Sequence, residues 1–64
     1  MIWFFRITFR HDNGEFKTIE VEKIFDPDET LLLSKIFDSI QLEIAKNSDE
    51  YGSVWQVEMS RRAA

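Results

Sequence analysis

The sequence contains no cysteine, one histidine, one proline and two glycines in 64 residues. The missing cysteines exclude disulfides, and a single histidine leaves almost no means of building a structural zinc site. No apolar run approaches the roughly 20 residues that a membrane-spanning helix needs. The apolar start MIWFF is interrupted by Arg6 and lacks a cleavage site, so we expect no signal peptide. These absences favour a cytoplasmic protein that is stabilised by packing alone and uses no cofactor.

The residues that are abundant are apolar and aromatic. They make up 44% of the chain, including six Phe and two Trp, which suffices for the core of one small domain spanning 1–64. Domains of this size often dimerise because their own core is small. The net charge is −4, from twelve acidic and eight basic residues. Direct binding to nucleic acid is therefore not expected, and a basic groove on another protein is a more natural partner.

Residues 26–46 predict the only helix. Asp26 and Glu29 have the spacing of a capping box around Pro27, so we expect the helix to begin there. At 100° per residue, one broad stripe predicts the face that covers a sheet. The stripe consists of Leu32, Leu33, Ile36, Phe37, Ile40 and Ile44. The polar segment 47–53 is expected to be a loop, and the tail 61–64 to be unordered.

Three segments alternate as β-strands do: 2–10, 15–25 and 54–60. In the first, Trp3, Phe5, Ile7 and Phe9 are expected to face inward. In the last, Trp55, Val57 and Met59 are expected inward and Val54, Gln56, Glu58 and Ser60 outward. A three-residue loop, Asp12-Asn13-Gly14, with Gly14 left-handed, predicts a register that pairs Arg6 with Glu20 and Thr8 with Thr18. A two-residue turn would place Thr8 opposite Ile19 and mix the two faces.

The element order strand, strand, helix, strand predicts an α+β fold with two layers. A right-handed crossover brings the last strand to the free edge of the first. We therefore expect a three-stranded antiparallel sheet of order 2-1-3 with the helix on one face and the other face uncovered.

Residues with catalytic or metal-binding potential are few. His11 lies beside the hairpin turn, without a nucleophile at a suitable spacing. The acidic clusters 26–29 and 49–50 do not match a calcium loop, and no glycine-rich phosphate loop is present. We expect a protein that is not an enzyme and binds no metal.

Two surfaces are candidates for partner binding. The uncovered sheet face collects apolar side chains among charges, and the back of the helix carries Leu42, with Leu31 about three turns away. The candidate partner-binding residues are Phe4, Arg6, Glu20, Glu22, Ile24, Val54 and Leu42. The sheet face is expected to be an interface; for Leu42 a simple exposed position is an equal alternative.

The order of these segments resembles that of the very small host-directed inhibitors of bacteriophages, such as T7-type RNA polymerase inhibitors and anti-CRISPR proteins. The similar stretches are FFRITF (4–9), FKTIEVEKIF (16–25), DPDETLLLSKIF (26–37) and VWQVEMSRR (54–62). The resemblance implies a phage or mobile-element protein that sterically blocks a host protein or ribonucleoprotein complex handling nucleic acid. An acidic edge of Glu20, Glu22, Asp26, Asp28 and Glu29 would then face a basic channel. The alternative is a homo-oligomeric or accessory subunit, such as a homodimer, that self-associates through the sheet face.

Overall fold

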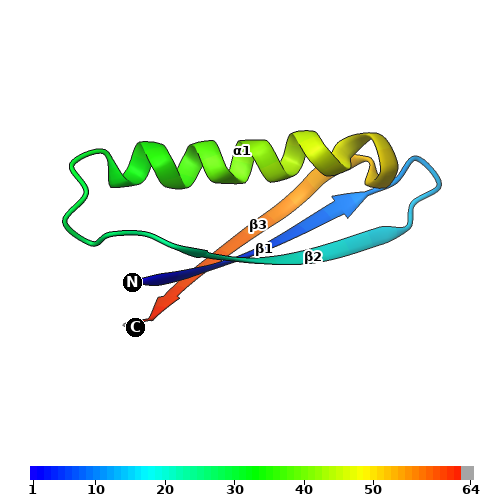
Figure 1. Cartoon of the computed structure of the whole chain (residues 1–64). Helices are drawn as coiled ribbons and strands as arrows, with labels where there is room; N and C mark the ends of the chain where they lie inside the picture. Colours follow the sequence, from blue (N-terminus) through cyan, green and yellow to red (C-terminus); the bar gives the residue numbers. More distant parts are fainter. Residues whose placement is uncertain (63–64) are drawn as a thin grey trace.

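The computed structural model describes residues 1–62 and has two layers, a three-stranded sheet and one helix that lies along one face of it (Figure 1). The elements follow in the order β1 (Ile2–Arg10), β2 (Phe16–Ile24), α1 (Leu32–Tyr51) and β3 (Ser53–Arg62). The sheet is antiparallel throughout, in the order β2-β1-β3. The predicted α+β fold and strand order are confirmed.

The hairpin between β1 and β2 closes through the predicted three-residue loop. The His11 N–H donates to the Glu15 carbonyl at 2.8 Å, and the Gly14 N–H donates to the His11 carbonyl at 2.9 Å. Gly14 has φ 87°, a left-handed conformation that glycine adopts without steric cost. Arg6 pairs with Glu20 and Thr8 with Thr18, so the predicted register is confirmed.

The acidic segment before the helix is a separate turn, and the predicted helix start at Asp26 is wrong. Asp26 Oδ1 accepts a bond from the Asp28 N–H at 2.9 Å, and the Glu29 N–H donates to the Asp26 carbonyl at 3.1 Å. An aspartate that bonds two residues ahead stabilises a turn in competition with a helix start. The helix begins at Leu32, and Leu31 at its N-cap has no side-chain capping bond. The predicted capping box of Asp26 and Glu29 does not form.

The end of the helix was also predicted wrongly, since α1 continues through the expected loop to Tyr51. Gly52 alone joins it to β3, with φ 98° and ψ −151°, a combination open essentially only to glycine. Its N–H donates to the Ser48 carbonyl at 2.9 Å. The polar residues 47–50 therefore form the last helical turn, in which Asp49 and Glu50 are exposed, and Tyr51 packs against Phe9 of the core. Arg61 and Arg62, predicted to be unordered, lie in β3, whereas Ala63 and Ala64 are outside the described residues.

A β-bulge changes the faces of β3 near its beginning. The register with β1 shifts between Thr8, which pairs with Gln56, and Phe9, which pairs with Val54. Trp55 is the extra residue. Val54 consequently shares the helix-facing side of Phe9, and Trp55 lies against Arg10 and Phe16 of the opposite side. The predicted faces of Val54 and Trp55 are thus exchanged, because one inserted residue reverses the alternation.

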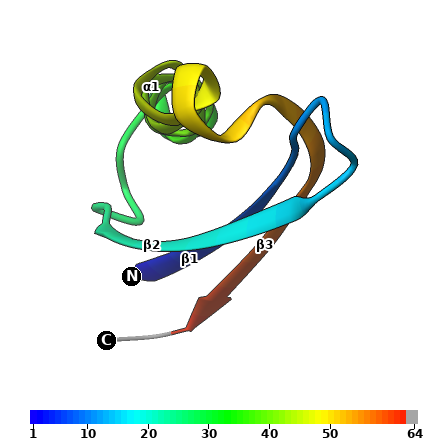
Figure 2. The same cartoon turned by 90° about the vertical axis from the view of Figure 1, so that its right-hand side faces the viewer.

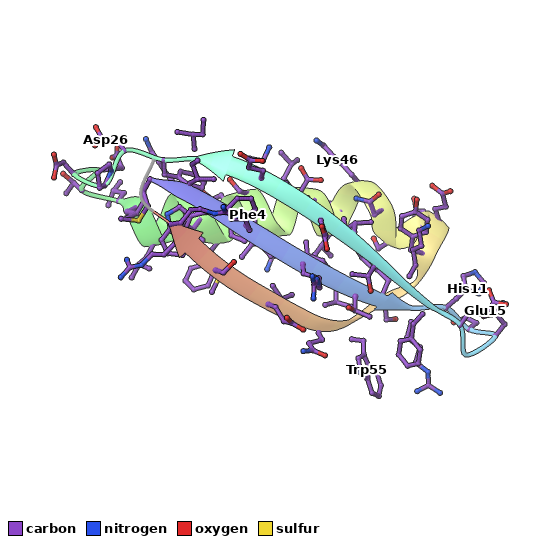
Figure 3. All side chains as sticks on the ribbon, turned by 90° about the horizontal axis from the view of Figure 1, so that it is seen from below. Phe4, His11, Glu15, Asp26, Lys46 and Trp55 are labelled. Carbon is purple, nitrogen blue, oxygen red and sulfur yellow. The ribbon has the colours of Figure 1, made fainter. Side chains whose placement is uncertain are left out.

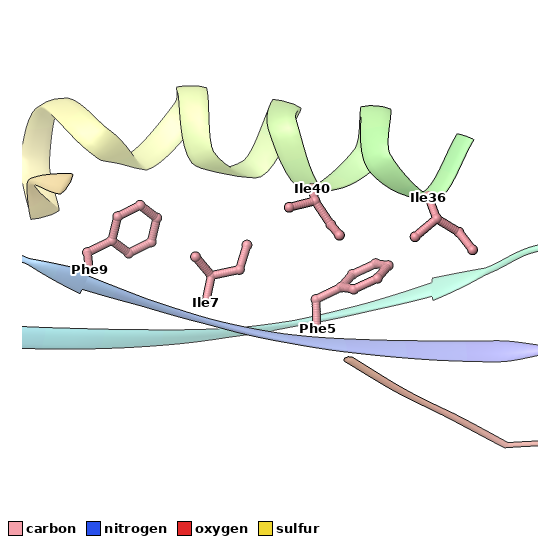
Figure 4. Packing of buried hydrophobic residues seen from close by; sticks show 5 residues of the cluster. All are labelled: Phe5, Ile7, Phe9, Ile36 and Ile40. Atoms are coloured by element: carbon pink, nitrogen blue, oxygen red, sulfur yellow. The ribbon is translucent and has the colours of Figure 1, made fainter. Parts of the chain in front are cut away.

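The core lies between β1 and α1 and is small. Among residues 1–62, five are buried: Phe5, Ile7, Phe9, Ile36 and Ile40 (Figure 4). Leu32 and Ile44 pack against them, as the stripe predicted. Leu33 and Phe37 do not, since they are 68% and 56% exposed. Phe37 lies at one margin of the stripe, beyond the arc that the helix buries on a narrow sheet. Leu33 lies within the stripe, but in the first turn of α1.

Candidate partner-binding surface

The sheet face opposite α1, which we call the outer face, has a polar centre. Arg6 Nη2 and Nε lie 3.1 and 3.2 Å from Glu20 Oε1, and Arg6 Nη1 lies 3.9 Å from Glu58 on the other neighbouring strand. The Thr8 and Thr18 hydroxyls are 3.1 Å apart and share a hydrogen bond. These groups are exposed, and exposed ion pairs of this kind contribute only about 0–1 kcal/mol to stability. Their main effect is to hold Arg6 across the three strands.

One end of the outer face is apolar. Phe4 lies there in the central strand (Figure 3), with Ile2 beside it and Ile24, which is 76% exposed, on β2. The Arg62 guanidinium lies over the Phe4 ring, 4.5 Å from its centroid. A cation over an aromatic face is attracted to it, and Arg62 leaves part of the ring open. This end therefore offers an aromatic anchor beside a positive charge.

The other end of the outer face carries a second aromatic group that the sequence did not predict. Phe16 and Trp55 meet edge to face, with centroids 5.4 Å apart, and both are more than half exposed. The Arg10 guanidinium lies 5.4 Å from the Trp55 ring centroid. Figure 3 shows Trp55 beyond the edge of the sheet on this side. Only the bulge brings Trp55 here, and no pattern in the sequence marks the bulge.

Between the two ends lies an open depression of about 580 Å³. Its outward-pointing lining residues are Phe4, Arg6, Glu20, Glu22, Glu58 and Ser60. An aromatic side chain surrounded by charged and hydroxyl groups is a composition found at protein–protein contacts.

The structure brings together five of the predicted partner-binding residues and separates two. Phe4, Arg6, Glu20, Glu22 and Ile24 share the outer face. Val54 lies on the helix-facing side because of the bulge. Leu42 is 54% exposed on α1, in the other layer, and so cannot belong to the same surface.

The excess negative charge of the chain does not lie on the outer face. There the arginines Arg6, Arg10 and Arg62 balance the glutamates Glu20, Glu22 and Glu58. The excess belongs to the connecting segments 11–15 and 26–29, which contain five acidic residues and no lysine or arginine, and to α1, which contains four acidic residues and two lysines. Within the predicted acidic edge, Glu20 is paired with Arg6, and Glu29 lies 3.1 Å from Lys35 Nζ. This hydrogen bond from Lys35, aided by the Leu31 N–H, holds the pKa of Glu29 below its ordinary value.

The side chains of the hairpin around His11 form hydrogen bonds within the turn itself. The Asn13 N–H points at His11 Nδ1 from 3.4 Å, and the Glu15 N–H donates to Asn13 Oδ1 at 2.9 Å. These bonds shape the turn.

Among residues 1–62 no group of three or more His, Asp or Glu side chains is placed to hold a metal ion. In the same range, no helix has the length and apolar character needed to cross a membrane.

Comparison of the chain with protein-family models, with curated proteins and with solved structures gives no match, so this surface stands without a related protein to interpret it.

Proposed function

We propose that this chain is a non-enzymatic binding protein that acts by covering a surface of a partner protein with its outer sheet face. The observation that carries the proposal is the half-buried Phe4 on the outer face of the central strand, with Arg62 over its ring and the open depression beside it. The aromatic pair of Phe16 and Trp55 extends the surface to the far end of the sheet. Aromatic and arginine side chains are the residues most enriched at interface hot spots.

The partner class that we propose is a host protein or ribonucleoprotein complex that handles nucleic acid, blocked sterically in the host cytoplasm. The choice follows from the resemblance of the segment order in the sequence to that of small phage inhibitors. The charge-balanced outer face suits a mixed protein surface better than a phosphate backbone. The acidic turn 26–29 follows directly on the Ile24 end of β2, where it would meet basic residues that surround a nucleic-acid channel.

The experiment is capture from bacterial lysate with wild-type protein and two matched variants, followed by mass spectrometry. Phe4→Asp changes the apolar end of the outer face, and Leu42→Asp makes the same kind of change on the exposed side of α1. We expect wild type and Leu42→Asp to retain the same protein and Phe4→Asp to lose it, with all three folded by circular dichroism. Retention by Phe4→Asp, or loss by Leu42→Asp alone, would contradict the proposal.

A second candidate is self-association through the same face, as in a homo-oligomeric accessory subunit. It is favoured by the equal mixture of arginine and glutamate there, which allows the face to complement another copy of itself. This candidate predicts a dimer that Phe4→Asp abolishes and that captures nothing from the lysate. Sedimentation of the wild type and this variant over a concentration series separates the two candidates.

A further inference from the structure

The C-terminal part of β3 is an open sheet edge. β3 pairs with β1 along one side only, so its other side presents backbone N–H and C=O groups to solvent. Beyond the bulge, residues 56–62 keep a regular register with β1 and so form a straight edge. The opposite edge strand is better protected, because β2 carries Lys17 and Lys23 on the helix-facing side, and charges on that side oppose further pairing.

Apolar side chains lie next to this edge. Met59 on β3 is 50% exposed, although it points to the same side as the core. The ion pair of Glu43 with Lys23 places one flank of α1 toward β2. Leu33 and Phe37 lie on the other flank by helical spacing, which is the β3 side of the sheet. Figure 2 shows β3 running away from α1 toward its C-terminal end. We call the space between them the wedge; by helical spacing and strand register, Leu33, Phe37 and Met59 are the exposed apolar residues beside it.

We propose that a second copy of this chain covers the edge, with the two β3 strands pairing antiparallel about a twofold axis at Met59. Directly opposite residues in such a pair point to the same side of the sheet. In this register Met59 lies opposite Met59 of the second copy, and Val57 lies opposite its Arg61. On the outer side, Glu58 lies opposite Ser60, and its two diagonal neighbours in the second copy are Arg62 and Glu58. No like charges lie directly opposite each other.

The other twofold registers fit less well. An axis at Glu58 places two glutamates directly opposite each other, which is destabilising. With an axis at Val57, the bulge at Trp55 lies two residues from the axis and interrupts the regular pairing there. An axis at Ser60 sets Glu58 opposite Arg62, which is favourable, but it uses only residues 58–62 of the described strand and sets Met59 against Arg61. The length of the paired stretch therefore selects the axis at Met59, which uses the whole regular stretch 56–62.

This arrangement also buries the wedge. Both helices lie on the same side of a continuous sheet, and their Leu33 and Phe37 flanks face each other. Each helix lies above its own β1, so the distance between the helix axes equals the distance between the two β1 strands. In the order β1, β3, β3, β1 these are separated by three strand spacings, or about 14 Å. That exceeds the roughly 8–10 Å of direct helix contact, so the gap accommodates the Leu, Phe and Met side chains of both copies. A chain with five buried residues and no disulfide gains the apolar burial that its own core lacks.

The test is sedimentation equilibrium of the full chain over a concentration series. We expect the wild-type mass to rise from 7.6 kDa to twice that value. Met59→Lys and Met59→Glu should each remain monomeric, because each opposes like charges across the axis. Mixed in equal amounts, the two variants should form a dimer, because opposite charges then meet. A variant that was only destabilised would not be restored by mixing.

The matched control is Leu42→Lys, which changes a similarly exposed apolar residue on the solvent side of α1 and should still dimerise. Should the Met59 variants fail to fold, Met59→Cys provides a second measurement in this cysteine-free chain. A short bis-maleimide should link two copies of Met59→Cys but not two copies of Leu42→Cys. A wild type that stays monomeric, a mixture that does not dimerise, or a dimer lost only in Phe4→Asp would overturn the proposal. The outer face remains free in this dimer, so failure here is distinct from failure of the proposed function.

Discussion

The single-residue connection at Gly52 allows a quantitative test of the fold. Both glycines have positive φ, 87° at Gly14 and 98° at Gly52, but their surroundings differ. A Cβ at position 14 would meet nothing within 4 Å, whereas a Cβ at position 52 would overlap the carbonyl of Arg10 at the end of β1. Gly14→Ala should therefore lose only the conformational advantage of glycine, about 1–2 kcal/mol.

Gly52→Ala should lose that amount and, in addition, the roughly 1–3 kcal/mol typical of overpacking, since the backbone of β1 must move. For a domain of this size, whose total stability is about 3–10 kcal/mol, the change removes a large share. The assay is urea unfolding of wild type, Gly14→Ala and Gly52→Ala at one protein concentration, followed by circular dichroism. Equal destabilisation by the two substitutions would refute the close approach of Gly52 to β1.

Three further predictions concern the core, the helix start and the hairpin. Ile40→Ala should destabilise the fold by about 2–5 kcal/mol, whereas Leu42→Ala should change it by less than about 1 kcal/mol, measured by the same unfolding assay. Because Lys35 lowers the pKa of Glu29, this pair stabilises the fold above the ordinary glutamate pKa and loses its effect as the pH falls through the lowered value. Glu29→Gln should thus lower the melting temperature at pH 7 and converge with wild type on acidification; an unchanged difference at low pH would contradict the pairing. His11→Ala should leave partner capture from lysate intact, and a loss of capture would assign His11 a role in binding.

The hairpin and sheet could be predicted from the sequence because their signals are local and mutually consistent. Large apolar residues alternate in β1 and β2, and only the loop with Gly14 in a left-handed conformation aligns both sets on one face. The charged and hydroxyl pairs, Arg6 with Glu20 and Thr8 with Thr18, then follow from the register.

The ends of the helix could not be predicted from the same kind of reasoning. Asp26 can cap a helix or stabilise a turn with the same side-chain oxygen, and the sequence does not distinguish the two. At the other end, polar residues 47–50 look like a loop because they form a helical turn without an apolar side chain of its own. The position of Gly52 against Arg10 is a tertiary contact, and it decides where α1 ends.

The candidate surface was predicted in part. Strand alternation placed Phe4, Arg6 and Ile24 on the outer face. The bulge reversed the alternation at Val54 and Trp55, so the second aromatic group was missed and one residue was assigned to the wrong side. A bulge depends on how two strands pair, and neither strand shows it alone.

The two tryptophans allow the most direct test of the outer face as a binding surface. Trp55 is 58% exposed on that face, whereas Trp3 lies on the helix-facing side, with its Nε1 buried. In the Trp3→Phe variant, Trp55 is the sole tryptophan reporter, and in Trp55→Phe it is Trp3. The measurement is acrylamide quenching of both variants before and after addition of the partner captured from lysate. Binding through the outer face predicts reduced quenching of Trp55 and unchanged quenching of Trp3; unchanged quenching of Trp55 in a saturated complex would contradict it.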